Sequence, residues 1–135
     1  MLNQDTKTHA HCIYSMHYHI VFVTKYRHKA LSPIMLGRLK DHFSRICSNA
    51  GCELKEMNGV ADHVHLLVET NPNILPSRLV NTLKTISSRE IRKEFAHDLS
   101  QFYWKPYLWT RAYCIVSAGG APLDIIKQYI QNQPG

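Results

Sequence analysis

The sequence lacks long hydrophobic runs and paired-cysteine motifs. No apolar stretch approaches the roughly 20 residues of a membrane-spanning helix, and the N-terminal residues MLNQDTKTHAH contain no apolar signal region. The cysteines form no C-x-x-C pair, which argues against a zinc ribbon, and the missing signal argues against a disulfide framework. These absences predict a cytoplasmic protein without membrane contact, in which Cys12, Cys47, Cys52 and Cys114 serve as small buried residues.

Acidic residues are scarce relative to basic ones. The chain has 16 Lys and Arg against 10 Asp and Glu, which gives a formal net charge of +6. A basic surface favours a polyanionic partner such as nucleic acid, although charge alone does not identify it. Because the sequence contains no repeat, low-complexity segment or linker, residues 1–135 are expected to form one domain.

Hydrophobic periodicity predicts the element order β-α-β-β-α-β-α. Strands are predicted over residues 13–24, 52–60, 64–69 and 112–118, with a hairpin turn at Asn58-Gly59. Helices are predicted over residues 33–49, from 76 to about 97, and from 122 onward. This order fits an α+β fold of the ferredoxin-like, split β-α-β (RRM-like) type, with two helices on one face of an antiparallel sheet. The last helix is left to cover the open face.

The stretch VADHVHLLVET places two histidines one residue apart in the third predicted strand. Because successive side chains of a strand point to opposite faces, His63 and His65 share the open face. The spacing suits a pair of metal ligands, but surface or packing histidines satisfy it equally. His17 and His19 occupy the same face of the first strand, where structural roles, DNA-facing roles and a four-histidine site all stay open.

Two carboxylates flank the histidine pair. Asp62 lies on the opposite strand face, so we expect a turn residue rather than a ligand. Glu69 shares the face of the histidines but lies about 13 Å along the strand from His65, and is expected to be solvated.

The last predicted helix carries Tyr129 and Gln133 on one face, since residues four apart are neighbours on a helix. A phenol and an amide oxygen would then face one target. A half-buried tyrosine and a solvated C-terminal glutamine explain the same spacing. Pro134 disfavours helical backbone at Gln133, which would take the amide away from that target.

Together, VADHVHLLVE and the C-terminal YIQNQ resemble the single-tyrosine HUH transposases of small bacterial and archaeal insertion sequences. In that family a His-hydrophobic-His strand pairs with a tyrosine helix of the form Y-I-x-x-Q. The resemblance takes in YHIVFVTKYRH, LKTISSREIRKEF and LWTRAYCIVSAGG, and so spans nearly the whole chain. The chain departs from the family pattern at VAD, where a proline is expected beside the aspartate.

The resemblance implies a DNA transposase that cuts and rejoins single-stranded DNA next to hairpins at element ends, through a covalent 5′-phosphotyrosine. It implies that Tyr129 is the nucleophile and that His63, His65 and Gln133 hold a divalent cation, Mg²⁺ or Mn²⁺. It also implies a homodimer in which the final helix, entered through Gly119-Gly120, crosses to the histidines of the other chain. The alternatives are a non-catalytic hairpin-binding relative and a metal-dependent phosphoesterase that uses water.

Basic and aromatic residues are candidates for DNA contact. The basic candidates lie after the first strand and on the second helix: Lys25, Arg27, Lys29, Lys84, Arg89, Arg92 and Lys93. The aromatic candidates for stacking on unpaired bases are Tyr103, Trp104, Tyr107 and Trp109. A solvated helix face and a packed aromatic loop explain the same residues without DNA.

Overall fold

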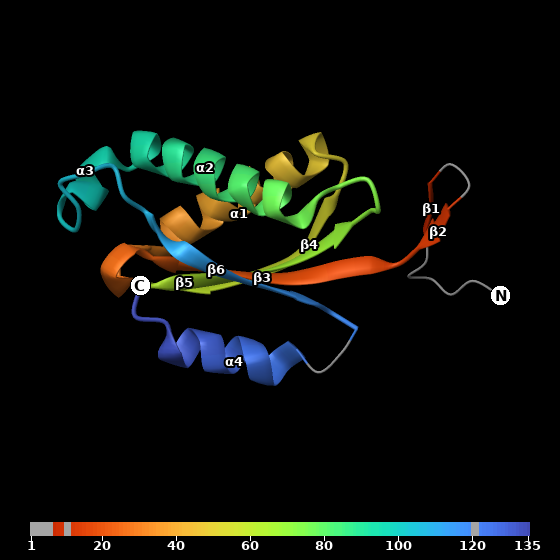
Figure 1. The fold of residues 1–135 in the computed structure, drawn as a ribbon. Helices are drawn as coiled ribbons and strands as arrows, with labels where there is room; N and C mark the ends of the chain where they lie inside the picture. Colours follow the sequence, from red (N-terminus) through yellow and green to blue (C-terminus); the bar gives the residue numbers. More distant parts are fainter. Residues whose placement is uncertain (1–6, 10–11, 120–121) are drawn as a thin grey trace.

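The computed structural model describes residues 7–9, 12–119 and 122–135. Its four-stranded antiparallel sheet has the order β4-β5-β3-β6, built from β3 (Met16–Thr24), β4 (Glu53–Val60), β5 (His63–Thr70) and β6 (Trp109–Ser117). Helices α1 (Pro33–Asn49) and α2 (Pro76–Glu94) cover one face, and α4 (Pro122–Asn132) lies against the other (Figure 1). The arrangement confirms the predicted ferredoxin-like α+β fold.

Shorter elements interrupt the predicted ones. The first predicted strand is divided at Ser15, and its beginning, β2 (Cys12–Tyr14), pairs with β1 (Lys7–His9) in a separate two-stranded sheet. The turn η1 (Lys25–Arg27) follows β3. The second helix ends at Glu94, because Phe95 adopts φ −124° and ψ 38°, and a separate short helix, α3 (Ala96–Ser100), follows. No helix among the described residues is long and apolar enough to cross a membrane.

The hairpin turn between β4 and β5 lies three residues later than predicted. Asn58 and Gly59 are inside β4, opposite His65 and Val64, and the turn falls at residues 61–62. Gly59 is needed for space, since a Cβ there would lie 2.7 Å from Cδ2 of Leu36 on α1. The glycine therefore allows close approach of a helix to the sheet, which the sequence pattern does not distinguish from a turn.

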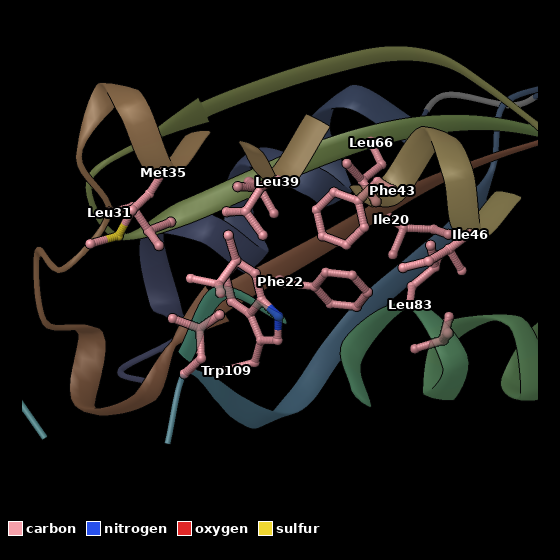
Figure 2. Packing of buried hydrophobic residues seen from close by; sticks show 14 of the residues in the cluster. Ile20, Phe22, Leu31, Met35, Leu39, Phe43, Ile46, Leu66, Leu83 and Trp109 are labelled. Carbon is pink, nitrogen blue, oxygen red and sulfur yellow. The ribbon is translucent and has the colours of Figure 1, made fainter. Parts of the chain in front are cut away.

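The main core lies between the sheet and the layer of α1 and α2 (Figure 2). Phe22 of β3 is completely buried, with its ring centroid 6.0 Å from that of Phe43 and 5.6 Å from that of Trp109. Trp109 is only 8% exposed, and its indole Nε1 donates to Ser87 Oγ at 2.9 Å. Of the two interpretations left open for Trp109, the packed side chain is therefore the right one: it belongs to the core.

The cysteines that the structure describes are free thiols. Cys47 and Cys114 are buried and Cys52 is partly buried, in agreement with their expected role as small packing residues. The side chain of Cys12 lies outside the described part. Burial raises the pKa of the Cys114 thiol, which favours its neutral form under α4.

Candidate active site on the open sheet face

The site begins with the strand register, which sets the two faces of the sheet. His65 lies opposite Val21 and His63 opposite Val23, so these four residues share the face turned away from α1 and α2. Val64, between the two histidines, is completely buried in the main core. The register thus gives the predicted division of β5 into an apolar inner face and a histidine-bearing outer face.

Helix α4 covers part of this outer face, as expected. Ile126 is 3% exposed and packs with Val21, Val23 and Cys114 in a second, small apolar cluster. Tyr129 is half-buried against the same cluster, one helical turn further along. Helix α4 therefore places Tyr129 on the sheet face that carries the histidines, on the opposite side of the sheet from α1 and α2 (Figure 1).

Gln133 stays with Tyr129 although Pro134 follows it. Helix α4 ends at Asn132, but the backbone N–H of Gln133 still donates to the carbonyl of Tyr129 at 2.9 Å. The side-chain amide Nε2 of Gln133 donates to the hydroxyl oxygen of Tyr129 at 3.2 Å. The two side chains therefore face one another as their four-residue spacing predicts.

Arg27 connects the end of α4 to the histidine strand. Its Nη1 donates to the carbonyl oxygen of Gln133 at 2.6 Å, and its Nε donates to Oδ2 of Asp62 at 3.1 Å. The other carboxylate oxygen of Asp62 lies 2.9 Å from Nδ1 of His63. We call this set the Arg27 bridge: Arg27 with Asp62, His63 and Gln133. Through it, hydrogen bonds from one residue to the next connect Tyr129 to His63, by way of the side chain and the backbone carbonyl of Gln133.

The carboxylate of Asp62 orients the ring of His63. Burial raises the pKa of the Asp62 carboxyl, but hydrogen bonds from His63 and Arg27 outweigh burial and hold that pKa below its ordinary value. Asp62 is therefore a carboxylate at neutral pH, and His63 donates its Nδ1 proton to it. A ring that donates from Nδ1 presents Nε2 as its ligating nitrogen, as in metal-binding histidines that donate their other ring nitrogen to a carboxylate. Asp62 is a turn residue, as expected, but it also orients a site residue.

His65 pairs with His19 on the neighbouring strand. Nε2 of His65 lies 2.8 Å from Nδ1 of His19, and the ring centroids are 4.9 Å apart. Burial, and then the nearby His19, lower the pKa of His65, and burial lowers the pKa of His19. Both rings are therefore neutral at pH 7, which is the form that metal ligation requires. Nε2 of His65 can bind a metal ion only when its contact with His19 opens.

Glu69 does not have the solvated environment expected for it. Its side chain is 13% exposed, and its Oε2 lies 3.2 Å from Nε2 of His17. Residues 17 and 69 are directly opposite in the β3-β5 register. His17 and Glu69 thus form a cross-strand pair, and His17 takes a structural role.

A metal centre here would rest on two imidazoles and an amide. Within residues 7–9, 12–119 and 122–135, no three histidine, cysteine or acidic side chains converge as a metal site. The third metal ligand predicted beside His63 and His65 is the side-chain oxygen of Gln133. In the structure this oxygen accepts from the Gly135 N–H at 3.2 Å. The Asp62–His63 hydrogen bond and the lowered pKa of His65 suit ligation of a divalent cation, so the residues present fit the implied group.

The environment of Tyr129 favours the neutral phenol. Burial raises its pKa above the usual value, and the Cys114 thiol acts in the same direction. The hydrogen bond from Gln133 opposes this shift. The Gln133 amide thus donates to the one atom on which a phenolate would carry its charge.

The structure separates the basic residues into two layers. Lys25, Arg27 and Lys29 lie in and after η1, next to the C-terminal end of α4, whereas α2 lies across the sheet from α4 (Figure 1). Lys84 of α2 donates to the carbonyl oxygens of Thr110 and Arg111, at 2.8 Å each. Burial, and then Arg111, lower the pKa of Lys84.

The other basic residues of α2 are more available. Arg89 is 58% exposed and Lys93 is exposed, while Nε of Arg92 donates to Ser88 Oγ at 3.1 Å. Arg27 and Lys84 use donors inside the protein, so they are less available to a phosphate than the predicted DNA-binding set assumes. The bridging role of Arg27 was missed because it depends on a contact 106 residues away in the sequence, for which no local pattern exists.

The comparisons with known proteins identify the family of the chain. Residues 12–133 match the family model described as "Transposase IS200 like". Over 121 residues the chain is 31% identical to the ISDra2 transposase TnpA of Deinococcus radiodurans, covering 90% of this chain and 86% of that protein. It is 30% identical over 129 residues to the transposase for insertion sequence element IS200 of Salmonella typhimurium, covering 96% and 84%.

Solved structures show the same fold. A crystal structure of a putative transposase from Deinococcus radiodurans superposes with a TM-score of 0.86 and 34% identity, over 94% of this chain and 97% of that one. A tyrosine transposase bound to a REP hairpin superposes with a TM-score of 0.50 and 11% identity, over 96% and 75%, which shows the fold alone. The family match covers nearly the whole chain, and the two curated relatives reach 30% identity over most of their length. The chain therefore belongs to the IS200-like transposase family of insertion sequences.

Proposed function

We propose that this transposase cuts and rejoins single-stranded DNA through a covalent bond to Tyr129. The observation that carries the proposal is the chain of hydrogen bonds from Tyr129 through Gln133 and the Arg27 bridge to His63. It ties a nucleophile, an amide and an oriented imidazole together, and these are the parts that a phosphoryl-transfer site requires. We propose residues 1–135 as one domain that contains all of them.

In the proposed cleavage, the phenol oxygen of Tyr129 forms a bond to the phosphorus as the bond from phosphorus to the 3′ oxygen breaks. The phenol proton leaves, and the departing 3′ oxygen takes up a proton to give a free 3′ hydroxyl. The 5′ end stays on the enzyme as a phosphotyrosine. An attacking 3′ hydroxyl reverses these steps, and because one phosphodiester replaces another of similar energy, rejoining needs no ATP.

His63, His65 and Gln133 would hold the divalent cation, which we propose to be Mg²⁺ or Mn²⁺. When bound, the cation supplies positive charge that polarises the scissile phosphate. Asp62 keeps the Nε2 lone pair of His63 available for this role. The amide of Gln133 has two functions, since its oxygen is the proposed ligand and its nitrogen donates to Tyr129 and so stabilises negative charge there.

The proposed substrate is single-stranded DNA next to a hairpin at each end of the element. The structural neighbour described as bound to a REP hairpin is consistent with such a substrate. Lys25, Lys29, Arg89, Arg92 and Lys93 are proposed to contact backbone phosphates, with Arg27 and Lys84 as members of the same basic set.

We also propose a homodimer with active sites shared between chains. In the structure α4 rests on the sheet of its own chain. An exchange of α4 between two chains would preserve each contact of Ile126 and of the Arg27 bridge. Of the predicted connection, Gly119 has an exposed position with nothing within 4 Å of an added Cβ, and Gly120 lies outside the described residues.

Covalent trapping tests the proposed chemistry. Wild-type protein is incubated with Mn²⁺ and a labelled oligonucleotide that carries a hairpin and a single-stranded flank, and products are separated under denaturing conditions. We expect a protein–DNA adduct that Tyr129→Phe abolishes and that Tyr113→Phe, an exposed tyrosine on β6, leaves unchanged. Cleavage that survives Tyr129→Phe without an adduct would establish a water-using phosphoesterase, and binding without cleavage would establish a non-catalytic relative.

Mixing variants tests the shared sites. A chain with His63→Ala and His65→Ala is combined with a Tyr129→Phe chain, each inactive alone. Exchanged helices would restore up to one intact site per mixed dimer and a corresponding fraction of adduct. No restored activity in a demonstrated mixed dimer would show that each site belongs to one chain.

A further inference from the structure

A second site of aromatic side chains lies beside the active site, between η1 and the segment that follows α3. We call it the aromatic pocket, and it is lined by Tyr26, His28, Phe102, Tyr103, Trp104 and Tyr107. Its volume of about 250 Å³ is below the roughly 300 Å³ at which pockets for drug-sized ligands begin. The space therefore suits one flat group, such as a single ring system, better than a larger ligand.

The inner part of the aromatic pocket is fixed by ring contacts. His28 stacks on Tyr103, with centroids 5.2 Å apart and an interplanar angle of 18°. Tyr107 meets the rings of Tyr26 and Tyr103 edge-on, at 5.9 Å and 6.2 Å. Tyr103 is 6% exposed, and its hydroxyl donates to the carbonyl oxygen of Lys25 at 2.6 Å. Tyr103 therefore stabilises the pocket and does not contact its occupant. This corrects its predicted role in direct stacking.

The outer part of the aromatic pocket is open to solvent. Trp104 is fully exposed, at 101%, Tyr26 is 57% exposed and Phe102 is 36% exposed. Large aromatic side chains with this exposure mark a surface that binds something, because aromatic rings gain more from burial than other side chains do. Buried rings below and solvent-exposed rings at the rim form a platform on which a base can stack.

The charge around the aromatic pocket indicates an anion. Nζ of Lys25 lies 5.1 Å and 5.2 Å from the ring centroids of Tyr26 and Tyr107, and Lys105 lines the pocket. No acidic side chain is among the residues that line the pocket in the part of the chain that the structure describes. A flat group that stacks on exposed rings and carries negative charge is a nucleotide.

The aromatic pocket is joined to the active site through η1. Tyr26 and Arg27 both have left-handed backbone, with φ of 58° and 53°, a conformation that is costly for bulky residues and that concentrates at functional positions. The N–H of Tyr26 donates to the carbonyl oxygen of Gly135 at 2.8 Å, two residues after Gln133. One turn thus holds Tyr26 at the pocket and Arg27 at the tyrosine helix.

We propose that the aromatic pocket takes one unpaired nucleobase of the DNA strand that is cleaved at Tyr129. The base stacks on the exposed rings of Trp104 and Tyr26, and Lys25 and Lys105 face its phosphates. This inference rests on the proposed function, since it assigns a position on the DNA substrate. It keeps Trp104 from the predicted stacking residues, adds Tyr26, and leaves out the buried Trp109 and Tyr103.

Tryptophan fluorescence and binding test this inference on the full chain, in the Tyr129→Phe background so that no DNA is cut. The probe is a single-stranded oligothymidylate 12-mer at low salt, with an abasic 12-mer as comparison. We expect the oligothymidylate to quench the emission of Trp104, and the quenching to disappear in Trp104→Phe, because Trp109 is buried. The abasic strand should bind more weakly and quench less.

Substitutions in the aromatic pocket give the second measurement. Trp104→Ala and Tyr26→Ala should each weaken binding of the oligothymidylate by about 5-fold to 100-fold. They should not change binding of the abasic strand, and Trp104→Ala should not change the thermal midpoint, since that side chain is fully exposed. Tyr113→Ala changes an aromatic residue that is 36% exposed and lies outside the pocket, and this variant should bind both strands as the parent does.

Several results would overturn the inference. These are unquenched Trp104 emission, no binding of the oligothymidylate, equal losses for both strands, or an equal loss in Tyr113→Ala. A change in sedimentation on Trp104→Ala with unchanged DNA affinity would assign the surface to a second copy of the chain instead. Failure of the proposed function is distinguishable, because the covalent adduct would then be absent while stacking on Trp104 persists.

Discussion

Replacing Arg27 with leucine should release α4 from the sheet without unfolding the rest of the protein. The substitution keeps an apolar side chain and removes the donors to Asp62 and to the carbonyl oxygen of Gln133. A hydrogen bond to a charged group contributes about 1.5–3 kcal/mol, and the side chains of Arg27 and Asp62 are 25% and 18% exposed, which favours the low end. Two such bonds give about 3 kcal/mol.

This loss is comparable to what the apolar contact of α4 contributes. Ile126 is the one completely apolar side chain of the described part of α4 that is buried, and full burial of such a side chain stabilises by about 1.5–3 kcal/mol. The main core lies on the other side of the sheet and contains no residue of α4. The helix should therefore undock locally while the sheet stays folded.

Hydrogen–deuterium exchange of the protein without DNA or metal measures the effect. Amides of α4 should exchange roughly 100-fold faster in Arg27→Leu, because about 1.4 kcal/mol corresponds to a factor of ten. Amides of β3 and β5 should be unchanged. Arg27→Lys should fall between the two, because an ammonium lacks the planar fork that reaches both acceptors.

Arg89→Leu is the matched control, since it removes an exposed arginine from α2. Unchanged protection of α4 in Arg27→Leu would refute the reasoning, because the Arg27 bridge would then not hold the helix. Equal loss of protection in α4, β3 and β5 would also refute it, because the helix would then unfold only with the whole domain.

Three further substitutions test other parts of the structure. Asp62→Asn should weaken Mn²⁺ binding about 10-fold to 100-fold in titration calorimetry, because it removes the carboxylate that orients His63, whereas Asp98→Asn on α3 should bind as wild type. Arg38, with His42, lowers the pKa of Glu94 to about 2 from 4.5, so the stabilisation that Glu94 gives is present above pH 4.5 and is lost as the pH falls toward 2. Chemical denaturation at several pH values should show this loss in the free energy of unfolding of the wild type, and a smaller loss in Glu94→Gln. An equal dependence of the free energy of unfolding on pH in the two proteins would contradict it. Gly59→Ala should lower the free energy of unfolding by about 1–3 kcal/mol through the clash with Leu36, whereas Gly37→Ala, in an open helical position, should raise it by about 0.5–1 kcal/mol.

Much of the fold follows from local patterns. Helix α1 begins at Pro33 because Ser32 Oγ accepts the N–H of Met35, and the same Ser-Pro pair identifies the start in the sequence. Alternation in β3 and β5 predicts which side chains enter the core. The hairpin turn was misplaced because a glycine that gives room to Leu36 has the same signature as a turn glycine.

The candidate site also has a part that follows from local patterns and a part that does not. The face shared by His63 and His65, and that shared by Tyr129 and Gln133, follow from strand and helix periodicity. The contacts that join the two faces do not, because Arg27, Asp62 and Gln133 are brought together by tertiary structure. The pairing of His19 with His65, and the exposure of Trp104 beside buried Trp109, likewise depend on register and packing.

Locating the covalent bond tests the central claim most directly. The adduct formed with a hairpin-bearing oligonucleotide and Mn²⁺ is digested with trypsin and nuclease and analysed by tandem mass spectrometry. Cleavage after Lys127 releases residues 128–135, QYIQNQPG, in which Tyr129 is the one tyrosine of the seven in the chain. We predict a nucleotide 5′-phosphate on this peptide, attached to Tyr129. A nucleotide on a different residue, or cut DNA with this peptide unmodified throughout the reaction, would contradict the account.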